Sequence, residues 1–183
     1  IIINYTSFMA FGEVTCMIFG GLSPWFTRCV GSKRMAFAYA SLLCCVASVA
    51  FFFIPMERSW MWLMLANVVV SSIGIGFYSP LLWSMYADVA DYATQQNGTS
   101  CTGLIFSSGT MSQKLGGAVS GSLIAMLLGL AGARMITENG GSTIDPASIT
   151  DSVRTMVWAL FSLFPAIIAL IMGVLAYFFP IKK

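Results

Sequence analysis

The longest uncharged stretch of the sequence is SWMWLMLANVVVSSIGIGFYSPLLWSMYA, residues 59–87. An α-helix needs about 20 mostly apolar residues to cross the hydrocarbon core of a bilayer, which is about 30 Å thick. This stretch is longer than that and carries no charge, so we expect it to form a transmembrane helix.

Four more apolar runs of similar length accompany it, at residues 4–27, 35–54, 101–131 and 155–179. Only two charged residues, Glu13 and Lys114, lie well inside the five runs. We therefore predict an all-α membrane protein with five transmembrane helices. Because the chain opens with Ile1 rather than Met, we also expect it to be a fragment of a longer protein.

The composition agrees with a membrane protein and excludes several other classes. Of 183 residues, 58% are hydrophobic and 9% are charged, whereas about 25% are charged in an average soluble domain. A net charge of +2 leaves no basic surface for nucleic acid. The chain has no His, and its five Cys form no C-x-x-C pair, so we expect no metal site, no disulfide framework and no His-based catalytic triad.

Basic residues predict the orientation, because Lys and Arg favour the cytoplasmic side of a membrane. Arg28, Lys33 and Arg34 lie between the first two runs, and Lys182 and Lys183 end the chain. Five helices place these two groups on one side, which leaves three basic residues on the other, namely Arg58, Arg134 and Arg154. We predict that the first side, with the C-terminus, is cytoplasmic. The long polar connection at residues 132–151 is then an outer loop.

Lys114 is the strongest anomaly in the sequence. It lies near the middle of the fourth run, where an ammonium group costs at least about 2.5 kcal/mol unless it faces protein or water. Ser107, Thr110 and Lys114 share one helix face by their spacing. We interpret this face as the lining of a substrate or ion path. The alternative is a Lys that only locks helix packing through a carboxylate.

Two acidic residues, Asp88 and Asp91, share a helix face at the expected inner end of the third run. Their spacing indicates either proton or cation handling or simply a solvated helix end. Trp83 lies on the inner half of the same helix, where its ring could fill the core or stack on a sugar ring.

Small residues predict where helices meet. Four of them recur every four positions in the fourth run, namely Gly117, Gly121, Ala125 and Gly129. This pattern lets two helix backbones approach closely in lipid, so we predict a packing face. Gly74, Gly76 and Pro80 are expected to interrupt the third helix, and Pro165 the fifth.

Three short stretches make the sequence resemble a known family. They are SPLLWSMYADVADY at residues 79–92, TGLIFSS at residues 102–108 and MSQKLGG at residues 111–117. They resemble the glycoside-pentoside-hexuronide:cation symporter family, to which melibiose permease belongs. That family is part of the major facilitator superfamily, with twelve helices in two six-helix halves. The resemblance implies that the five helices are helices eight to twelve and that residues 28–34 form a basic cytoplasmic turn.

The resemblance also implies roles for single residues. Lys114 and Thr110 would lie beside the coupled sugar and cation sites, and Trp83 would border the sugar pocket. Asp88 and Asp91 would couple conformational changes at the inner end. The segment ATQQNGTS at residues 93–100 departs from the family, whose members usually carry several charged residues there.

For the full-length protein we expect symport of a sugar, glycoside or hexuronide with Na⁺ or H⁺, by alternating access in a bacterial inner membrane. Its partners would be the lipid bilayer, the sugar substrate and the N-terminal half of the same transporter. We expect no cofactor apart from the coupling ion, no nucleic acid and no enzymatic activity. The alternatives are a non-transporting sensor or scaffold module, which the odd number of helices favours, and lysolipid transport within the same superfamily.

Overall fold

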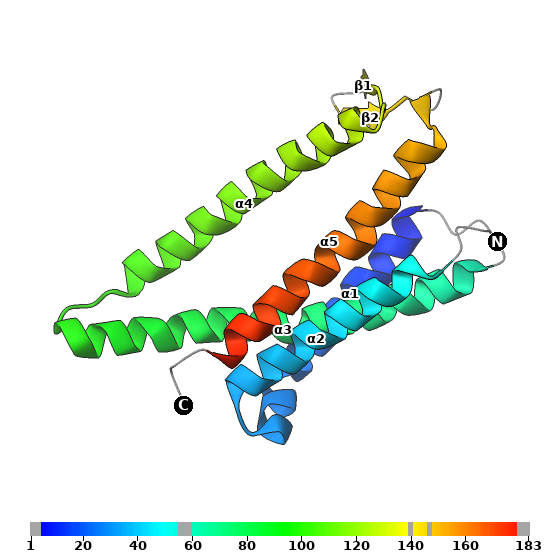
Figure 1. Ribbon diagram of the computed structural model, residues 1–183. Helices are drawn as coiled ribbons and strands as arrows, with labels where there is room; N and C mark the ends of the chain where they lie inside the picture. The colour runs from blue at the N-terminus through cyan, green and yellow to red at the C-terminus, as the bar shows by residue number, and fades with distance from the viewer. Residues whose placement is uncertain (1–4, 55–59, 139–140, 146–147, 179–183) are drawn as a thin grey trace.

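A computed structural model describes residues 5–54, 60–138, 141–145 and 148–178, which form five α-helices and one β-hairpin (Figure 1). The helices are α1 (Tyr5–Val30), α2 (Lys33–Phe52), α3 (Met61–Asn97), α4 (Thr102–Leu130) and α5 (Asp151–Tyr177). Each helix contains most of one of the five apolar runs of the sequence. The prediction of an all-α membrane architecture is therefore confirmed.

Four of the helices, α2 to α5, are long and apolar enough to cross a membrane. α1 is not among them, although its 26 residues would extend about 39 Å at the helical rise of about 1.5 Å per residue. It is the helix that carries Glu13 inside its length.

Glycine residues determine where three helices end. Gly31 follows α1 with a φ of 80°, Gly98 follows α3 with a φ of 68°, and Gly132 lies just past α4 with a φ of 95°. Glycine is favoured in this left-handed region because it has no Cβ atom. In α3 the first glycine with a positive φ is Gly98, and the helix continues beyond its apolar run to Asn97.

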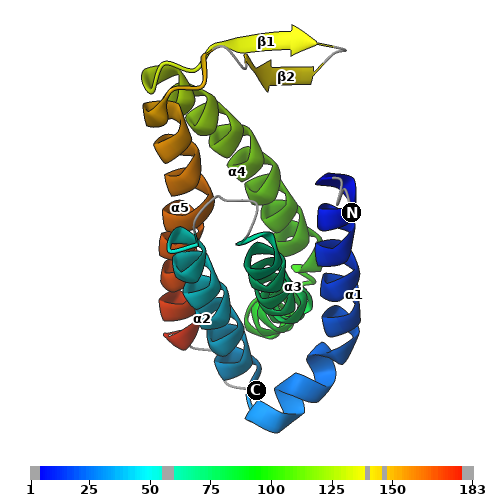
Figure 2. The ribbon, with the colours of Figure 1, turned by 90° about the vertical axis from the view of Figure 1, so that its right-hand side faces the viewer.

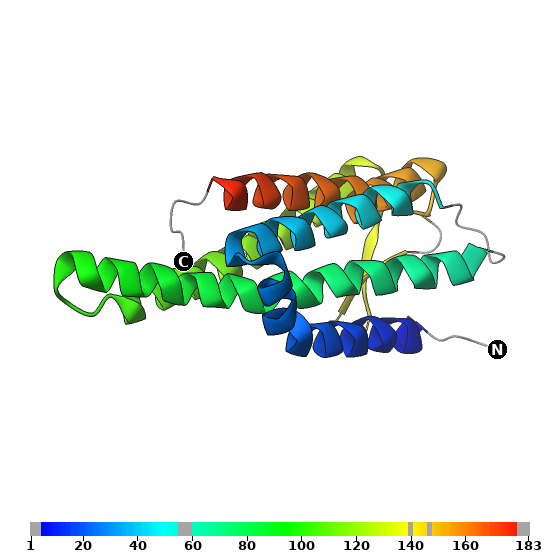
Figure 3. The same ribbon diagram turned by 90° about the horizontal axis from the view of Figure 1, so that it is seen from below.

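α3 lies at the centre of the arrangement. It packs against α1 on one side and α2 on the other, and α2 also packs against α5 (Figure 2). α3 is 37 residues long, or about 55 Å, which exceeds the hydrocarbon thickness of about 30 Å. Its C-terminal part and the start of α4 therefore project beyond the turn between α1 and α2 (Figure 3).

α4 runs back from the end of α3 and diverges from the other helices over much of its length (Figure 1). Among its described residues only Gly109 and Leu128 are buried. One long face of α4 is thus left without a neighbour in the part of the chain that the structure describes.

The predicted interruption of α3 does not occur, because α3 is helical throughout Gly74, Gly76 and Pro80. The two glycines instead permit close contact with neighbouring helices. A Cβ atom on Gly74 would collide with the Cys44 sulfur of α2, and one on Gly76 would lie 2.8 Å from the carbonyl oxygen of Cys16 in α1. Pro165 likewise lies inside a continuous α5.

The contact between α1 and α3 is built from small residues at a spacing of four. A Cβ on Gly12 would lie 3.1 Å from Ser72 Oγ, and one on Gly20 would lie 3.7 Å from the Gly76 carbonyl oxygen. The Ser23 hydroxyl donates a hydrogen bond of 3.3 Å to the carbonyl of Phe77. Small residues in both helices allow this close approach, as in other membrane helix pairs.

A compact apolar cluster joins α2, α3 and α5. Its buried members are Ala36, Phe37, Leu81, Met85 and Ala176. The cluster holds the three helices together next to the turn between α1 and α2, where charged residues also gather.

The connection between α4 and α5 contains a hairpin that was not predicted. β1 (Met135–Glu138) pairs antiparallel with β2 (Gly141–Ile144), so that Met135 lies opposite Ile144. The sequence between the strands is Asn139-Gly140, a dipeptide typical of tight hairpin turns. These two residues lie outside the described part of the chain.

Candidate functional site

The stripe of Ser107, Thr110 and Lys114 lies on an exposed face of α4. Each hydroxyl bonds within the helix, with Ser107 Oγ donating to Leu104 O at 3.0 Å and Thr110 Oγ1 donating to Ser107 O at 2.9 Å. Lys114 makes no ion pair with any residue that the structure describes. The residue is exposed.

Trp83 lies in an aromatic cluster where α3 and α4 meet. Its ring is nearly parallel to that of Phe106, with centroids 6.1 Å apart and an angle of 10° between the planes, and it meets Tyr86 edge to face at 5.7 Å. Gly109 permits the two helices to approach, because a Cβ there would lie 2.9 Å from Cε2 of Tyr86. Phe106 and Tyr86 were not singled out from the sequence.

Asp88 has a partner in this chain, the side chain of Lys33. The Lys33 ammonium donates to both carboxylate oxygens, at 2.8 Å to Oδ2 and 3.0 Å to Oδ1. The Asp88 side chain is 15% exposed and that of Lys33 is 35% exposed. A cation at the start of a helix opposes the helix dipole, so the carboxylate also offsets an unfavourable charge at the beginning of α2.

Asp91 differs from Asp88, although they share a helix face in the sequence. It is exposed and makes no ion pair within the described residues. The two predicted acidic residues therefore differ: the Asp88 carboxylate joins α3 to α2, whereas Asp91 is exposed. Of the other basic residues in the turn, Arg28 lies in the last turn of α1 and Arg34 at the start of α2.

The small residues predicted to form a packing face of α4 meet nothing in the described chain. A Cβ on Gly117, Gly121 or Gly129 would have no atom within 4 Å, and Ala125 is exposed. Their role in helix packing stays a prediction. The equivalent pattern that does pack here, Gly12-Cys16-Gly20 in α1, could have been found from its spacing of four.

The described residues were also searched for side chains that could hold a metal ion. They contain no group of three or more His, Cys, Asp or Glu side chains that could hold a metal ion. The five cysteines are free thiols.

Comparison with known proteins gives one family for nearly the whole chain. The family described as "MFS/sugar transport protein" matches residues 3–183. The chain is 36% identical over 101 residues to an uncharacterized 29.9 kDa protein in the crtE 3' region of Pseudescherichia vulneris, covering 55% of this chain and 36% of that protein. No solved structure matches.

Two relatives from Escherichia coli K12 have transporter names. The inner membrane symporter YicJ is 29% identical over 144 residues, covering 79% of this chain and 29% of its own length. The glucuronide carrier protein homolog is 26% identical over 160 residues, covering 87% of this chain and 32% of its own length. The chain thus spans about a third of the length of the curated relatives that it matches.

The match to the family covers well over half of the chain, and the helices of the structure fit a multi-pass membrane protein. The chain belongs to the MFS/sugar transport protein family of membrane transporters.

Proposed function

We propose that this chain is the C-terminal part of a secondary transporter that moves a sugar, glycoside or hexuronide together with Na⁺ or H⁺. In this proposal its five helices are helices eight to twelve of a twelve-helix transporter. The N-terminal half supplies the other side of the substrate cavity, and the two halves rock around a site near the membrane midplane. The relatives named as a symporter and as a glucuronide carrier homolog support this class of substrate.

The observation that carries the proposal is the position of Lys114. A lysine within a membrane span needs protein or water around its ammonium group. Lys114 lies on the face of α4 that has no neighbour in the described chain, together with the Thr110 and Ser107 hydroxyls. A water-filled cavity between two halves of a transporter provides the environment that this face requires.

The same cavity gives Trp83 a function. Trp83 belongs to α3, whereas the Lys114 stripe belongs to the neighbouring helix α4. The ring of Phe106, also in α4, lies nearly parallel to the indole ring of Trp83. In the proposal Trp83 borders the sugar, and the aromatic neighbours fix the plane of its ring.

Asp88 and Asp91 have different functions in this proposal. Asp88 binds Lys33 inside this half and so makes the inner end of the half rigid. Asp91 is exposed and can pair with a basic residue of the other half when the inner side closes. Conformational coupling at the inner gate therefore depends on Asp91 more directly than on Asp88.

The test is uptake of a radiolabelled glycoside by the full-length protein in membrane vesicles, driven by an imposed Na⁺ or H⁺ gradient. We expect Lys114→Ala to lower uptake at least tenfold, because the cavity loses its fixed positive charge. Val119→Ala is the control, since Val119 is exposed on α4 and its spacing of five from Lys114 and nine from Thr110 places it on another face of the helix. Both variants must reach the membrane in wild-type amounts. Unchanged affinity for sugar and for cation in Lys114→Ala would contradict the assigned role.

A further inference from the structure

A cavity between α2, α3 and α5 has polar groups in its wall, although the helices around it are apolar. Its volume is about 280 Å³. Four hydroxyl-bearing side chains line it, two from α2 and two from α3, namely Ser41, Ser48, Ser71 and Tyr78. All four belong to the apolar runs of these helices, and none belongs to the Lys114 stripe. The proposed transport site therefore does not account for this cavity.

The hydroxyl groups at this cavity have no partners in the described chain. Ser41 is 2% exposed, and its buried Oγ makes no hydrogen bond with any residue that the structure describes. α5 covers it, because a Cβ on Gly173 would lie 3.6 Å from the Ser41 Cβ. The hydroxyls of Ser48, Ser71 and Tyr78 likewise bond to no other described residue. A hydroxyl without a hydrogen bond costs free energy in apolar surroundings, so these groups call for a polar ligand.

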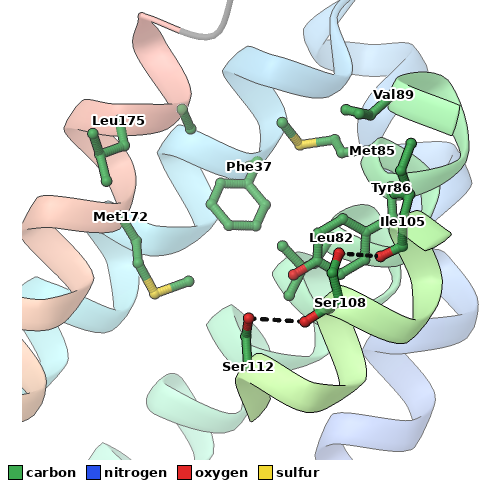
Figure 4. Close-up of a pocket in the computed structure, with 12 residues that line it drawn as sticks. Phe37, Leu82, Met85, Tyr86, Val89, Ile105, Ser108, Ser112, Met172 and Leu175 are labelled. Carbon is green, nitrogen blue, oxygen red and sulfur yellow. Dashed lines mark hydrogen bonds between the residues drawn. The ribbon is translucent and has the colours of Figure 1, made fainter. Parts of the chain in front are cut away.

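Hydroxyl groups elsewhere in the structure bond within their own helix. Ser162 is fully buried, and its Oγ donates to Trp158 O at 2.7 Å. The same holds at a larger cavity of about 490 Å³ between α2, α3, α4 and α5 (Figure 4). There Ser108 Oγ donates to Ile105 O and Ser112 Oγ donates to Ser108 O, both at 2.8 Å. The serines of the larger cavity therefore require no polar ligand, in contrast to those between α2, α3 and α5.

The wall of the smaller cavity restricts the kind of ligand. None of the described residues that line it is charged, so the ligand is neutral. It must donate and accept hydrogen bonds, because hydroxyl groups do both. It must also be small enough to reach Ser41 beneath α5. Water meets all three requirements, and at about 30 Å³ for each molecule in the liquid the cavity has room for several.

We propose that this cavity is a hydration site, in which bound water bridges the hydroxyl of Ser41 in α2 to that of Tyr78 in α3. Buried waters typically make about three hydrogen bonds to otherwise unsatisfied groups, and four hydroxyls are available here. α5 contributes Pro165 to the wall. Because proline has no N–H, the carbonyl of Phe161 lacks its usual helical donor, and ordered water can satisfy such a group in a membrane helix. The inference is independent of which solute is transported.

The first experiment is X-ray hydroxyl-radical footprinting of the purified full-length protein, read by mass spectrometry. Irradiation converts bound water into radicals that oxidise the nearest side chains. Tyr78 should be oxidised roughly fivefold faster than its chain neighbour Phe77, which is 8% exposed and stacks on Phe26. Ser48→Leu fills the cavity and should slow the oxidation of Tyr78 roughly threefold. Val46→Leu adds bulk on the exposed face of α2 and should leave that rate unchanged.

The second experiment tests whether Ser41 itself binds the water. Thermal unfolding in detergent is measured for the full-length variants Ser41→Ala and Tyr78→Phe and for the double variant. If water bridges the two hydroxyls, each single substitution should lower the unfolding midpoint by roughly 2 °C, and the double variant by less than the sum. Ser162→Ala is the control, because its hydroxyl bonds within α5 and such a bond adds little to a helix. Its midpoint should not fall.

Several results would overturn the proposal. Equal oxidation rates for Tyr78 and Phe77 would show that the cavity holds no water, as when another part of the protein fills it. A raised midpoint for Ser41→Ala would show that its hydroxyl has no partner, because removal of an unsatisfied buried group is stabilising. An unchanged midpoint would mean that Ser41 bonds within α2, and additive effects with Tyr78→Phe would exclude a shared water. No transport is measured, so failure here leaves the proposed function untouched.

Discussion

At the scale of single residues, the ion pair between Lys33 and Asp88 shows how one contact joins two helices. Lys33 begins α2 and Asp88 lies within α3, so the pair joins two helices beside the turn between α1 and α2. Both side chains are partly shielded from water, which strengthens their attraction relative to an exposed pair.

We predict that Asp88→Asn lowers the stability of the full-length protein by roughly 1 kcal/mol, the upper end for ion pairs that remain partly solvated. The measurement is thermal unfolding in detergent for the single variants Asp88→Asn and Lys33→Gln and for the double variant. A positive coupling energy in this double-mutant cycle would confirm the pair.

Asp91→Asn is the matched control, because Asp91 is exposed and makes no ion pair in the described residues. It should unfold at the wild-type temperature. Additive effects of the Lys33 and Asp88 substitutions would mean that the contact contributes nothing to stability.

These residues also show what a sequence can reveal about a site. Lys114 could be identified because a charge inside an apolar run is a local anomaly. The pairing of Lys33 with Asp88 could not be identified, because the two residues are 55 positions apart and only the packing of α2 on α3 brings them together. Phe106 likewise comes close to Trp83 only because α4 folds back against the end of α3.

At the scale of elements, small residues determine how closely α1 and α2 approach α3. Gly76 faces Cys16 of α1, and Gly74 faces Cys44 of α2, so α3 is held from two sides. In lipid no hydrophobic force drives helices together, and close van der Waals packing takes its place. These glycines are therefore expected to matter for folding rather than for bending.

We predict that Gly76→Ala destabilises the full-length protein by about 1–3 kcal/mol, the usual range for overpacking. The added methyl group would lie 2.8 Å from a backbone oxygen, which cannot move aside easily. Thermal unfolding in detergent measures the effect.

Gly21→Ala provides the comparison, since a Cβ there meets nothing within 4 Å. Identical unfolding temperatures for the two variants would show that α1 and α3 are not in close contact.

The helices were predictable because their apolar runs are long, whereas their ends were less so. The apolar run of α3 ends at Ala87, but the helix continues to Asn97 and ends before Gly98. Helix formation depends on backbone conformation as well as on hydropathy. The hairpin between α4 and α5 was missed because its strands are only four residues long, although Asn139-Gly140 is a recognisable turn signal.

At the scale of the whole molecule, the distribution of basic residues predicts an orientation in the membrane. We predict that the hairpin lies outside the cell and that the turn between α1 and α2 lies in the cytoplasm. In full-length protein whose native cysteines are replaced by serine, Ser142→Cys should react with a membrane-impermeant maleimide in intact cells. Ser32→Cys should react only after the membrane is permeabilised. The reverse pattern would refute the orientation.

The proposal of a larger transporter depends on the free face of α4. Lys114, Thr110 and Ser107 are exposed on it, as are the small residues from Gly117 onward. The chain spans about a third of the length of its curated relatives, so in a transporter of their size other helices would cover this face.

The most direct test of symport is uptake by the purified full-length protein in sealed liposomes that contain no other transporter. A glycoside should accumulate above its external concentration when an inward Na⁺ or H⁺ gradient is imposed, and an ionophore that dissipates the gradient should abolish the accumulation. Glycoside levels that never exceed the external concentration under either gradient, in liposomes shown to contain folded protein, would contradict cation-coupled transport.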